Sequence, residues 1–127
     1  MAEFNFELVS PERVLMSRSV EHVVLPGSEG MLGVLSGHSP AVVTLKPGVI
    51  SILSGSLVTR KIYVRGGFAE INPESVTVLA VHAVNTEAVD KEAIVSELSV
   101  AEKDLADASG DDARFTAQSA IDALKSL

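Results

Sequence analysis

The side chains that could perform acid–base or metal chemistry in this sequence are three histidines and a pair of adjacent aspartates. His22 and His82 stand alone within apolar runs, and His38 has no cysteine, orienting aspartate or second histidine at ligand spacing. Asp111 and Asp112 follow a glycine and suit the start of a helix. Nothing around these acids suggests a raised pKa for proton transfer. The sequence therefore predicts no catalytic residue, no metal site and no enzyme, with His38 structural or at an interface.

A glycine-rich segment from Pro26 to Pro40 is the most unusual stretch, with four glycines between Gly27 and Gly37. It lacks the G-K-[ST] ending of a phosphate-binding loop, and its glycine spacing does not match G-x-G-x-x-G opening a helix. Tight turns around a short strand explain the glycines, because glycine adopts positive φ without steric cost. The segment thus predicts a constrained backbone and no bound cofactor.

Composition excludes several classes of function. The net charge is −7 and aromatic residues make up 4% of the chain, which disfavours binding to nucleic acid phosphates and bases. The chain has no cysteine, so a disulfide framework and thiolate chemistry are excluded and a reducing compartment is favoured. The N-terminus lacks a basic region followed by an apolar core, and no run reaches the roughly 18 apolar residues of a membrane span. We expect a protein that is neither exported nor integral to a membrane.

Residues 1–84 are expected to form an antiparallel sandwich or barrel, because short apolar runs alternate with turn residues. Phe4, Phe6 and Leu8 alternate with polar residues, as in a strand with one buried face. The run 76–81 is almost wholly apolar and predicts a central strand buried on both faces. Between the runs, 46–48 suits a type II turn, and Gly66-Gly67 suits either a hairpin turn or a sharp bulge.

Residues 86–127 are expected to form a second unit, an antiparallel hairpin of two helices, because alanine, leucine and acidic residues replace glycine and proline. This unit carries ten acids and four bases, whereas residues 1–85 carry seven acids and six bases. Such asymmetry is usually a solvated face and only sometimes a partner surface. The hairpin is predicted to pack on the sandwich through apolar residues at helical spacing: Ile94, Leu98, Leu105 and Ile121.

The glycine-rich segment also resembles a family signature. Gly27-Ser28-Glu29-Gly30, Leu32-Gly33 and Gly37-His38-Ser39-Pro40 are similar to G-S-E-G-x-L-G-x-x-x-G-H-x-P of F-type ATP synthase epsilon subunits. Three later blocks agree in order and spacing: Leu45-Lys46-Pro47-Gly48, Gly66-Gly67-Phe68-Ala69-Glu70-Ile71 and Val76-Thr77-Val78-Leu79-Ala80. The resemblance runs to about residue 84, while the helical part is similar only in type. The start at Met1 without an arginine-rich leader favours a bacterial member.

This resemblance implies a ten-stranded flattened β-sandwich followed by the helical hairpin. It also implies a non-catalytic rotor subunit of the central stalk, peripheral on the cytoplasmic face of the bacterial plasma membrane. The partners would be the gamma subunit and the c-ring. The expected c-ring contact is Ser28, Glu29, Gly30, Met31, Leu32 and Gly33, and the expected gamma contact is His38, Ser39 and Pro40. An apolar docking patch is expected on the face presenting residues 31–39.

The sequence departs from the family at positions that bear on regulation. Several members carry an acid facing the c-ring where this chain has Met31, and Glu29 could substitute. Members that bind ATP use [IL]-D-x-x-R-A, whereas residues 89–94 read V-D-K-E-A-I, so no nucleotide cofactor is expected. Inhibition in the family brings basic helices to an acidic stretch of the beta subunits. The acidic helices here predict weak inhibition or none.

A second hypothesis belongs to a different class. The chain could be a stand-alone ligand-binding β-sandwich whose helical hairpin acts as a lid or dimerisation element. A monomer with a deep apolar pocket would favour this module, and co-purification with a gamma homologue would favour the rotor subunit.

Overall fold

The computed structural model describes residues 3–80, 83–85 and 91–125, and within these ranges it contains eight strands and two helices. The expected class, mainly β with a C-terminal helical hairpin, is confirmed. The strands are β1 Phe4–Val9, β2 Val14–Val20, β3 His22–Gly27, β4 Gly30–Leu35, β5 Ala41–Ser54, β6 Leu57–Asn72, β7 Ser75–Leu79 and β8 Ala83–Asn85. The helices are α1 Lys91–Asp107 and α2 Asp111–Lys125.

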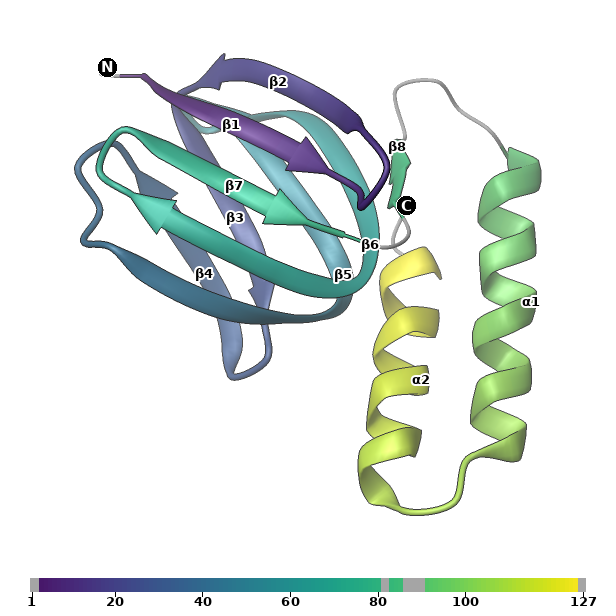
Figure 1. Ribbon diagram of the computed structural model, residues 1–127. Coiled ribbons are helices and arrows are strands. Elements are labelled where there is room, and N and C mark those ends of the chain that lie inside the picture. The colour runs from purple at the N-terminus through teal and green to yellow at the C-terminus, as the bar shows by residue number, and fades with distance from the viewer. Residues whose placement is uncertain (1–2, 81–82, 86–90, 126–127) are drawn as a thin grey trace.

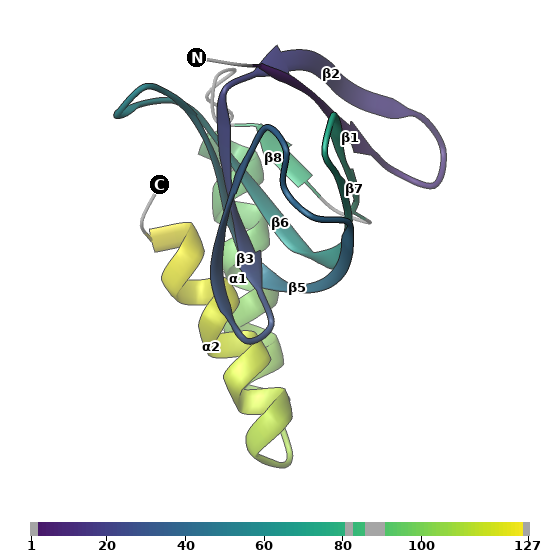
Figure 2. The ribbon, with the colours of Figure 1, turned by 90° about the vertical axis from the view of Figure 1, so that its left-hand side faces the viewer.

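The strands form one hydrogen-bonded sheet that folds over itself as a flattened sandwich (Figures 1 and 2). Its order is β2-β1-β7-β6-β5-β3-β4, and β8 pairs with β6. The β1–β7 pair is parallel and the other pairs are antiparallel. Because β5 and β6 take part in both layers, they join the β2-β1-β7 layer to the β3-β4 layer.

The sandwich core consists of aliphatic and phenylalanine side chains that alternate along the strands. In β1, Phe4, Phe6 and Leu8 are buried, which confirms the predicted alternation, while Asn5 is exposed. The rest of this cluster comes from strands β2 to β7: Val20, Val23, Leu25, Val34, Leu45, Ile50, Ile52, Ile62, Val64, Ala69, Ile71, Val76 and Val78, with Ala80 just beyond β7. Ala83 of β8 is half-buried and packs against the cluster.

The expectation of ten strands is not met, since the described residues form eight. The sequence interpretation placed a type II turn at 46–48 and either a hairpin turn or a sharp bulge at Gly66-Gly67. Both segments lie inside the long strands β5 and β6 and face each other in the pairing register, so neither turn is formed. Gly67 has φ of 136°, and a Cβ there would collide with the carbonyl oxygen of Leu79. Glycine is therefore needed for a bend that allows close approach, and the chain bends without ending the strand.

The strand over residues 76–79 is central, as predicted, because β7 lies between β1 and β6. The expectation that both its faces are buried is wrong. Val76 and Val78 face the core, whereas Thr77 is half-buried and Leu79 is 40% exposed. The apolar run therefore has an uncovered side, which residue types alone did not reveal.

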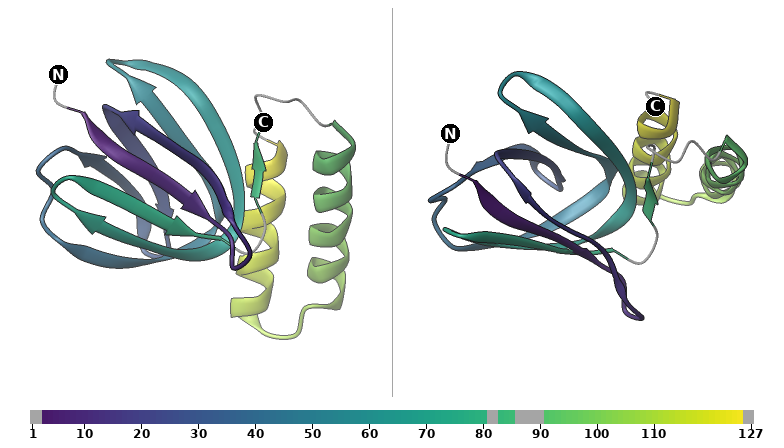
Figure 3. Two further views of the ribbon diagram at one scale, coloured as in Figure 1. Left: turned by 45° about the horizontal axis from the view of Figure 1, so that its top comes forward. Right: turned by 90° about the horizontal axis from the view of Figure 1, so that it is seen from above.

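The helical hairpin lies against one side of the sandwich, with α2 between the sheet and α1 (Figure 3). Helix α2 packs on β5 and β6. Gly110, with φ of 99°, lies in the short connection between the helices, as the glycine before Asp111 predicted. The hairpin is therefore a third layer added to the sandwich.

Candidate functional site: the β3–β4 hairpin and the clefts beside it

The structure brings the six expected ring-contact residues together at the tip of one hairpin. Strands β3 and β4 pair up to Gly27 and Gly30, leaving Ser28 and Glu29 as the two-residue turn. Gly30 has φ of 139°, which favours glycine. The backbone NH of Ser28 donates to the Thr44 carbonyl at 2.9 Å, which ties the turn to β5. The tip therefore has a fixed backbone and exposed side chains, which suits it for contact with another molecule.

The three expected gamma-contact residues lie elsewhere. His38, Ser39 and Pro40 follow β4 at its far end, so the length of β4 separates them from the turn, about 20 Å at 3.3 Å per residue. The neighbouring Gly37 NH donates to the Pro73 carbonyl at 2.8 Å, which ties this loop to the β6–β7 turn. His38 Nδ1 lies 2.7 Å from the Ser39 carbonyl oxygen. The histidine thus has a structural hydrogen bond, and the two predicted contacts are separate surfaces.

Two clefts flank the β3–β4 hairpin, and Met31 lines both of them. The first, of about 500 Å³, lies between the hairpin tip and residues 42–44 of β5. The second, of about 460 Å³, lies between the hairpin and α2 and includes Lys46, Lys61 and Phe115. Met31 is 60% exposed, so the position where several family members carry an acid presents an apolar side chain to solvent.

The helical hairpin is attached to the sandwich through a small apolar cluster around Tyr63. Tyr63, on the outer side of β6, is completely buried and packs with Ala101 of α1 and with three residues of α2: Ala120, Ile121 and Leu124. Leu98 and Leu105 are half-buried against this cluster. Three of the predicted packing residues, Leu98, Leu105 and Ile121, therefore lie where they were expected. The side chain of Ile94 lies outside the described residues.

One ion pair reinforces this attachment. The Arg65 guanidinium binds the Glu97 carboxylate through two NH groups, and its Nε lies 3.2 Å from Glu97 Oε2. Burial alone would lower the pKa of Arg65, but the hydrogen bond and the negative charge of Glu97 outweigh it and raise the pKa. Burial raises the pKa of Tyr63, and the charge of Glu97 adds to this effect. Nearby Arg65 partly offsets that increase, although the Tyr63 hydroxyl has no hydrogen bond of good geometry in the described structure.

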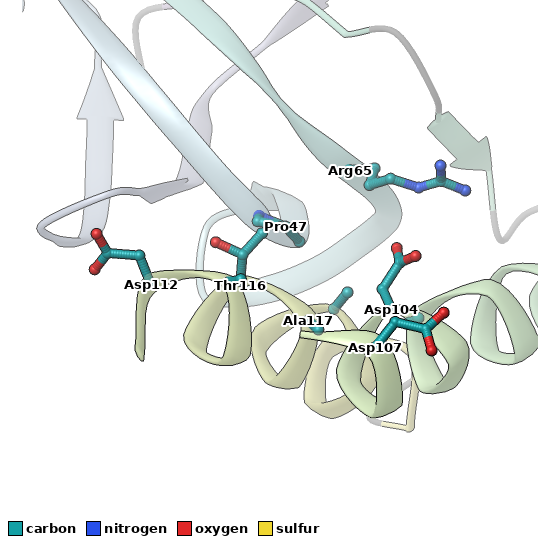
Figure 4. A pocket seen from close by; sticks show the side chains of 10 residues that line it. Pro47, Arg65, Asp104, Asp107, Asp112, Thr116 and Ala117 are labelled. Atoms are coloured by element: carbon teal, nitrogen blue, oxygen red, sulfur yellow. The ribbon is translucent and has the colours of Figure 1, made fainter. Parts of the chain in front are cut away.

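A third cleft, of about 520 Å³, lies between the helices and the β5–β6 bend (Figure 4). Pro47 and Arg65 line it from the strands, and Asp104, Asp107 and Asp112 line it from the helices. Arg65 already binds Glu97, so little positive charge remains for a triphosphate. Across the described ranges no cluster of histidine and acidic residues has the arrangement of a metal site. The three aspartates that line this cleft therefore disfavour a triphosphate there.

The sequence interpretation missed an apolar row on the outer face of the other layer. The pairing register aligns Phe68, Leu79, Val9 and Val14 across β6, β7, β1 and β2. Phe68 is 53% exposed, and Val14 is also exposed. Leu79 lies on the same side of β7 as half-buried Thr77, opposite the core residues Val76 and Val78, but the sequence does not show whether another layer covers that side. An apolar row of this extent suits a docking surface.

The structure defines a class of protein: a β-sandwich with a C-terminal helical hairpin and, over its described residues, no group of histidine and acidic side chains that could hold a metal ion. No helix in the described ranges is long and apolar enough to cross a membrane. Residues 3–86 match the family model described as "ATP synthase, Delta/Epsilon chain, beta-sandwich domain". The chain therefore belongs to the family of ATP synthase delta and epsilon chains.

Relatives named "ATP synthase epsilon chain" agree with this family. The chain is similar to that of Parvibaculum lavamentivorans, with 48% identity covering all of this chain and 97% of the relative. It is similar to that of Mesorhizobium japonicum, with 44% identity covering 100% of this chain and 95% of the relative. The match to that of Granulibacter bethesdensis has 54% identity but covers 65% of this chain and 62% of the relative. Whole-length relatives thus exist beside others that match over a shorter stretch.

Solved structures share the fold. A chain of the Euglena gracilis mitochondrial ATP synthase, in a structure containing OSCP, F1 and the c-ring, is similar with a TM-score of 0.70 and 24% identity. That match covers 98% of this chain and 79% of the other. A chain of the Tetrahymena thermophila mitochondrial ATP synthase central stalk and c-ring is similar with a TM-score of 0.66 and 12% identity, covering 98% and 96%. At these identities the likeness concerns the fold.

Proposed function

We propose that this chain is a non-catalytic rotor subunit of a bacterial, proton-translocating F-type ATP synthase. It links the gamma subunit to the c-ring and contributes to coupling, as a peripheral component on the cytoplasmic face of the plasma membrane. The observation that carries this proposal is the 48% identity, across the whole chain, to a bacterial protein named ATP synthase epsilon chain. Coupling through such a subunit requires shape and fixed surfaces rather than a nucleophile or a cofactor.

The separate ends of β4 suit this function, because a linking subunit needs two distinct docking surfaces. The tip residues Ser28–Gly33 face the c-ring. His38, Ser39 and Pro40 face the gamma subunit. Their separation along β4 lets the rigid sandwich span the two partners, and the sandwich core supplies the stiffness.

Two structural units share these roles. We assign residues 1–84 to the docking domain and residues 86–127 to the helical hairpin, whose described part packs on the sandwich through the Tyr63 cluster. Ten acids against four bases in the hairpin disfavour an approach to an acidic stretch of the beta subunits. We infer that the hairpin inhibits ATP hydrolysis weakly or not at all.

The ligand-binding module with a helical lid is the weaker alternative. Aliphatic side chains fill the sandwich interior. The clefts described above open between surface elements and are lined by exposed groups such as Asp104 and Asp107. A deep apolar pocket would be needed for a buried ligand.

Affinity purification of the tagged chain from detergent-solubilised membranes tests the rotor function. We expect the gamma subunit and the c-ring to co-purify in fixed proportion to the chain. Recovery of the chain as a monomer, with neither partner present, would contradict the proposal and favour the alternative.

Gly30→Arg tests the ring contact at the hairpin tip. No atom lies within 4 Å of the position where a Cβ would be added, so the cost comes from the unfavourable φ and from the bulky cation presented to the partner. We expect circular dichroism to show that the variant is folded. It should still co-purify with gamma, but less c-ring should co-purify with it. Unchanged ring recovery and unchanged coupling would show that this hairpin is not the contact.

A further inference from the structure

The cleft between the β3–β4 hairpin and α2 has walls that belong to both units of the chain. Met31 of β4 lines one side and Phe115 of α2 lines the other, and they are 60% and 57% exposed. Buried Pro26 and Pro47 contribute to the same cleft. Two large apolar side chains that both face solvent across a cleft form a favourable contact for an apolar group of a partner.

A lysine adds charge to this apolar cleft. Lys46 Nζ lies 5.5 Å from the centre of the Phe115 ring, within the range of a cation–π contact. Within the described part of the chain, Lys46 makes no ion pair with a carboxylate. Lys61 and Asp122 also line the cleft, so two lysines and one aspartate stand beside the exposed apolar side chains. The net positive charge favours a partner carrying a carboxylate next to an apolar group.

We propose that this cleft is part of the ring contact, so that the ring-binding surface is composite: the β3–β4 hairpin together with Lys46 and with Phe115 of docked α2. The occupant is a polar loop at the cytoplasmic rim of the c-ring that presents a carboxylate to Lys46 and an apolar side chain between Met31 and Phe115. This inference rests on the proposed rotor function. The cleft is continuous with the hairpin tip assigned to the ring, because Met31 belongs to both.

An acid at position 31, as in several family members, would make this surface negative, whereas Lys46 makes it positive in this chain. Met31 cannot form an ionic contact, and Lys46 supplies a positive charge on the adjoining surface. The ring group that pairs with this chain is then an acid rather than a base. A second consequence concerns the helices, because docked α2 supplies Phe115 to the ring contact. Undocking the helical hairpin therefore weakens ring binding even though the tip of the β3–β4 hairpin is unchanged.

Site-directed photo-crosslinking tests the composite contact in the assembled complex. The chain has no cysteine, so a single introduced cysteine carries a maleimide photo-crosslinker at one known place. The variants are Phe115→Cys in the cleft, Ser28→Cys at the hairpin tip and Val95→Cys on α1 as the matched control. Val95 is exposed and does not line the cleft.

We expect the crosslinker at positions 28 and 115 to label the c-ring, and the crosslinker at position 95 to leave it unlabelled. Labelling from position 28 alone would overturn the composite contact and leave the rotor function intact. A crosslink from position 115 to gamma or to a second copy of this chain would also overturn it. Labelling from neither 28 nor 115 would contradict the rotor proposal itself.

Charge variants test the carboxylate on the partner. Lys46→Glu is expected to lower c-ring recovery about tenfold, because like charges then meet at the contact, whereas Lys46→Arg keeps recovery close to that of the unchanged chain. Lys103→Glu, an equal charge change on the exposed side of α1, is the control and should have little effect. Equal recovery for Lys46→Glu and Lys103→Glu would exclude Lys46 from the contact.

Discussion

The sandwich and the helical hairpin are stabilised in different ways. The sandwich encloses a continuous cluster of buried side chains from seven strands, fixed by backbone pairing across the whole sheet. The hairpin is attached through a small cluster in which Tyr63 is the buried sandwich member, together with the Arg65–Glu97 ion pair. We therefore expect the first unit to remain folded without the second, and the second to depend on the first. A rotor subunit gains from this difference, because the part that transmits force is stiff and the appended part is separable.

A core substitution in the sandwich should have the largest effect. Phe6 is fully buried between the layers, and we expect Phe6→Ala to lower the free energy of unfolding by about 3 to 5 kcal/mol. Urea denaturation followed by circular dichroism measures this change. A loss below about 1 kcal/mol would mean that the sandwich core tolerates cavities and is not the rigid unit described.

The matched substitution in the hairpin should act locally. Leu124→Ala removes a buried side chain from the Tyr63 cluster, and we expect it to weaken hairpin docking by about 2 to 4 kcal/mol. Hydrogen exchange should then rise in α1 and α2 while the strands keep their protection. Equal loss of protection in β1 and β7 would show that the two units unfold together and that the comparison is wrong.

Most of this architecture could be predicted from the sequence because alternation and helical spacing report directly on burial. Phe4, Phe6 and Leu8 marked a strand correctly, and Leu98, Leu105 and Ile121 marked the packed helical faces. The ten strands that the resemblance implied are not confirmed, because Pro47 and Gly66-Gly67 lie within the long strands β5 and β6 and bend them without ending them. The apolar row at Phe68 and Leu79 was missed because exposure depends on which layer covers a strand, and this is a tertiary property.

The Arg65–Glu97 ion pair should contribute less than the apolar cluster. Its side chains are 31% and 14% exposed, so solvent screens the attraction and we expect Arg65→Ala to weaken docking by roughly 1 kcal/mol. Arg114→Ala, at an exposed position on α2, removes the same charge without breaking this pair. Exchange rates in α1 should rise for the first variant only. The same rise in both would assign the effect to net charge.

Substitution of Tyr63 should have the smallest effect on hairpin docking at neutral pH. Its hydroxyl is buried without a well-formed hydrogen bond, so Tyr63→Phe should change docking by less than about 1 kcal/mol, in either direction. Alkaline pH should reveal a difference. Burial and Glu97 raise the pKa of Tyr63 above its ordinary value of 10.0, so the undocked state ionises first and docking weakens as pH rises past 10.0.

This tyrosine is the single one in the chain, so tyrosinate absorbance reports its ionisation without interference. Helix exchange in the unchanged chain should accelerate together with that absorbance, and the Tyr63→Phe variant should lack the acceleration. Acceleration that persists in the phenylalanine variant would assign the alkaline effect to other groups.

Removal of the helical hairpin tests most directly whether the sandwich alone carries the gamma contact and whether the hairpin inhibits hydrolysis. The measurement is ATP hydrolysis by the reconstituted complex containing a chain that lacks residues 86–127, compared with the full chain. We predict that the shortened chain still assembles with gamma and that hydrolysis changes little, because the acidic hairpin contributes weak inhibition or none. Several-fold activation of hydrolysis, or failure of the shortened chain to assemble with gamma, would contradict the division of roles between the two units.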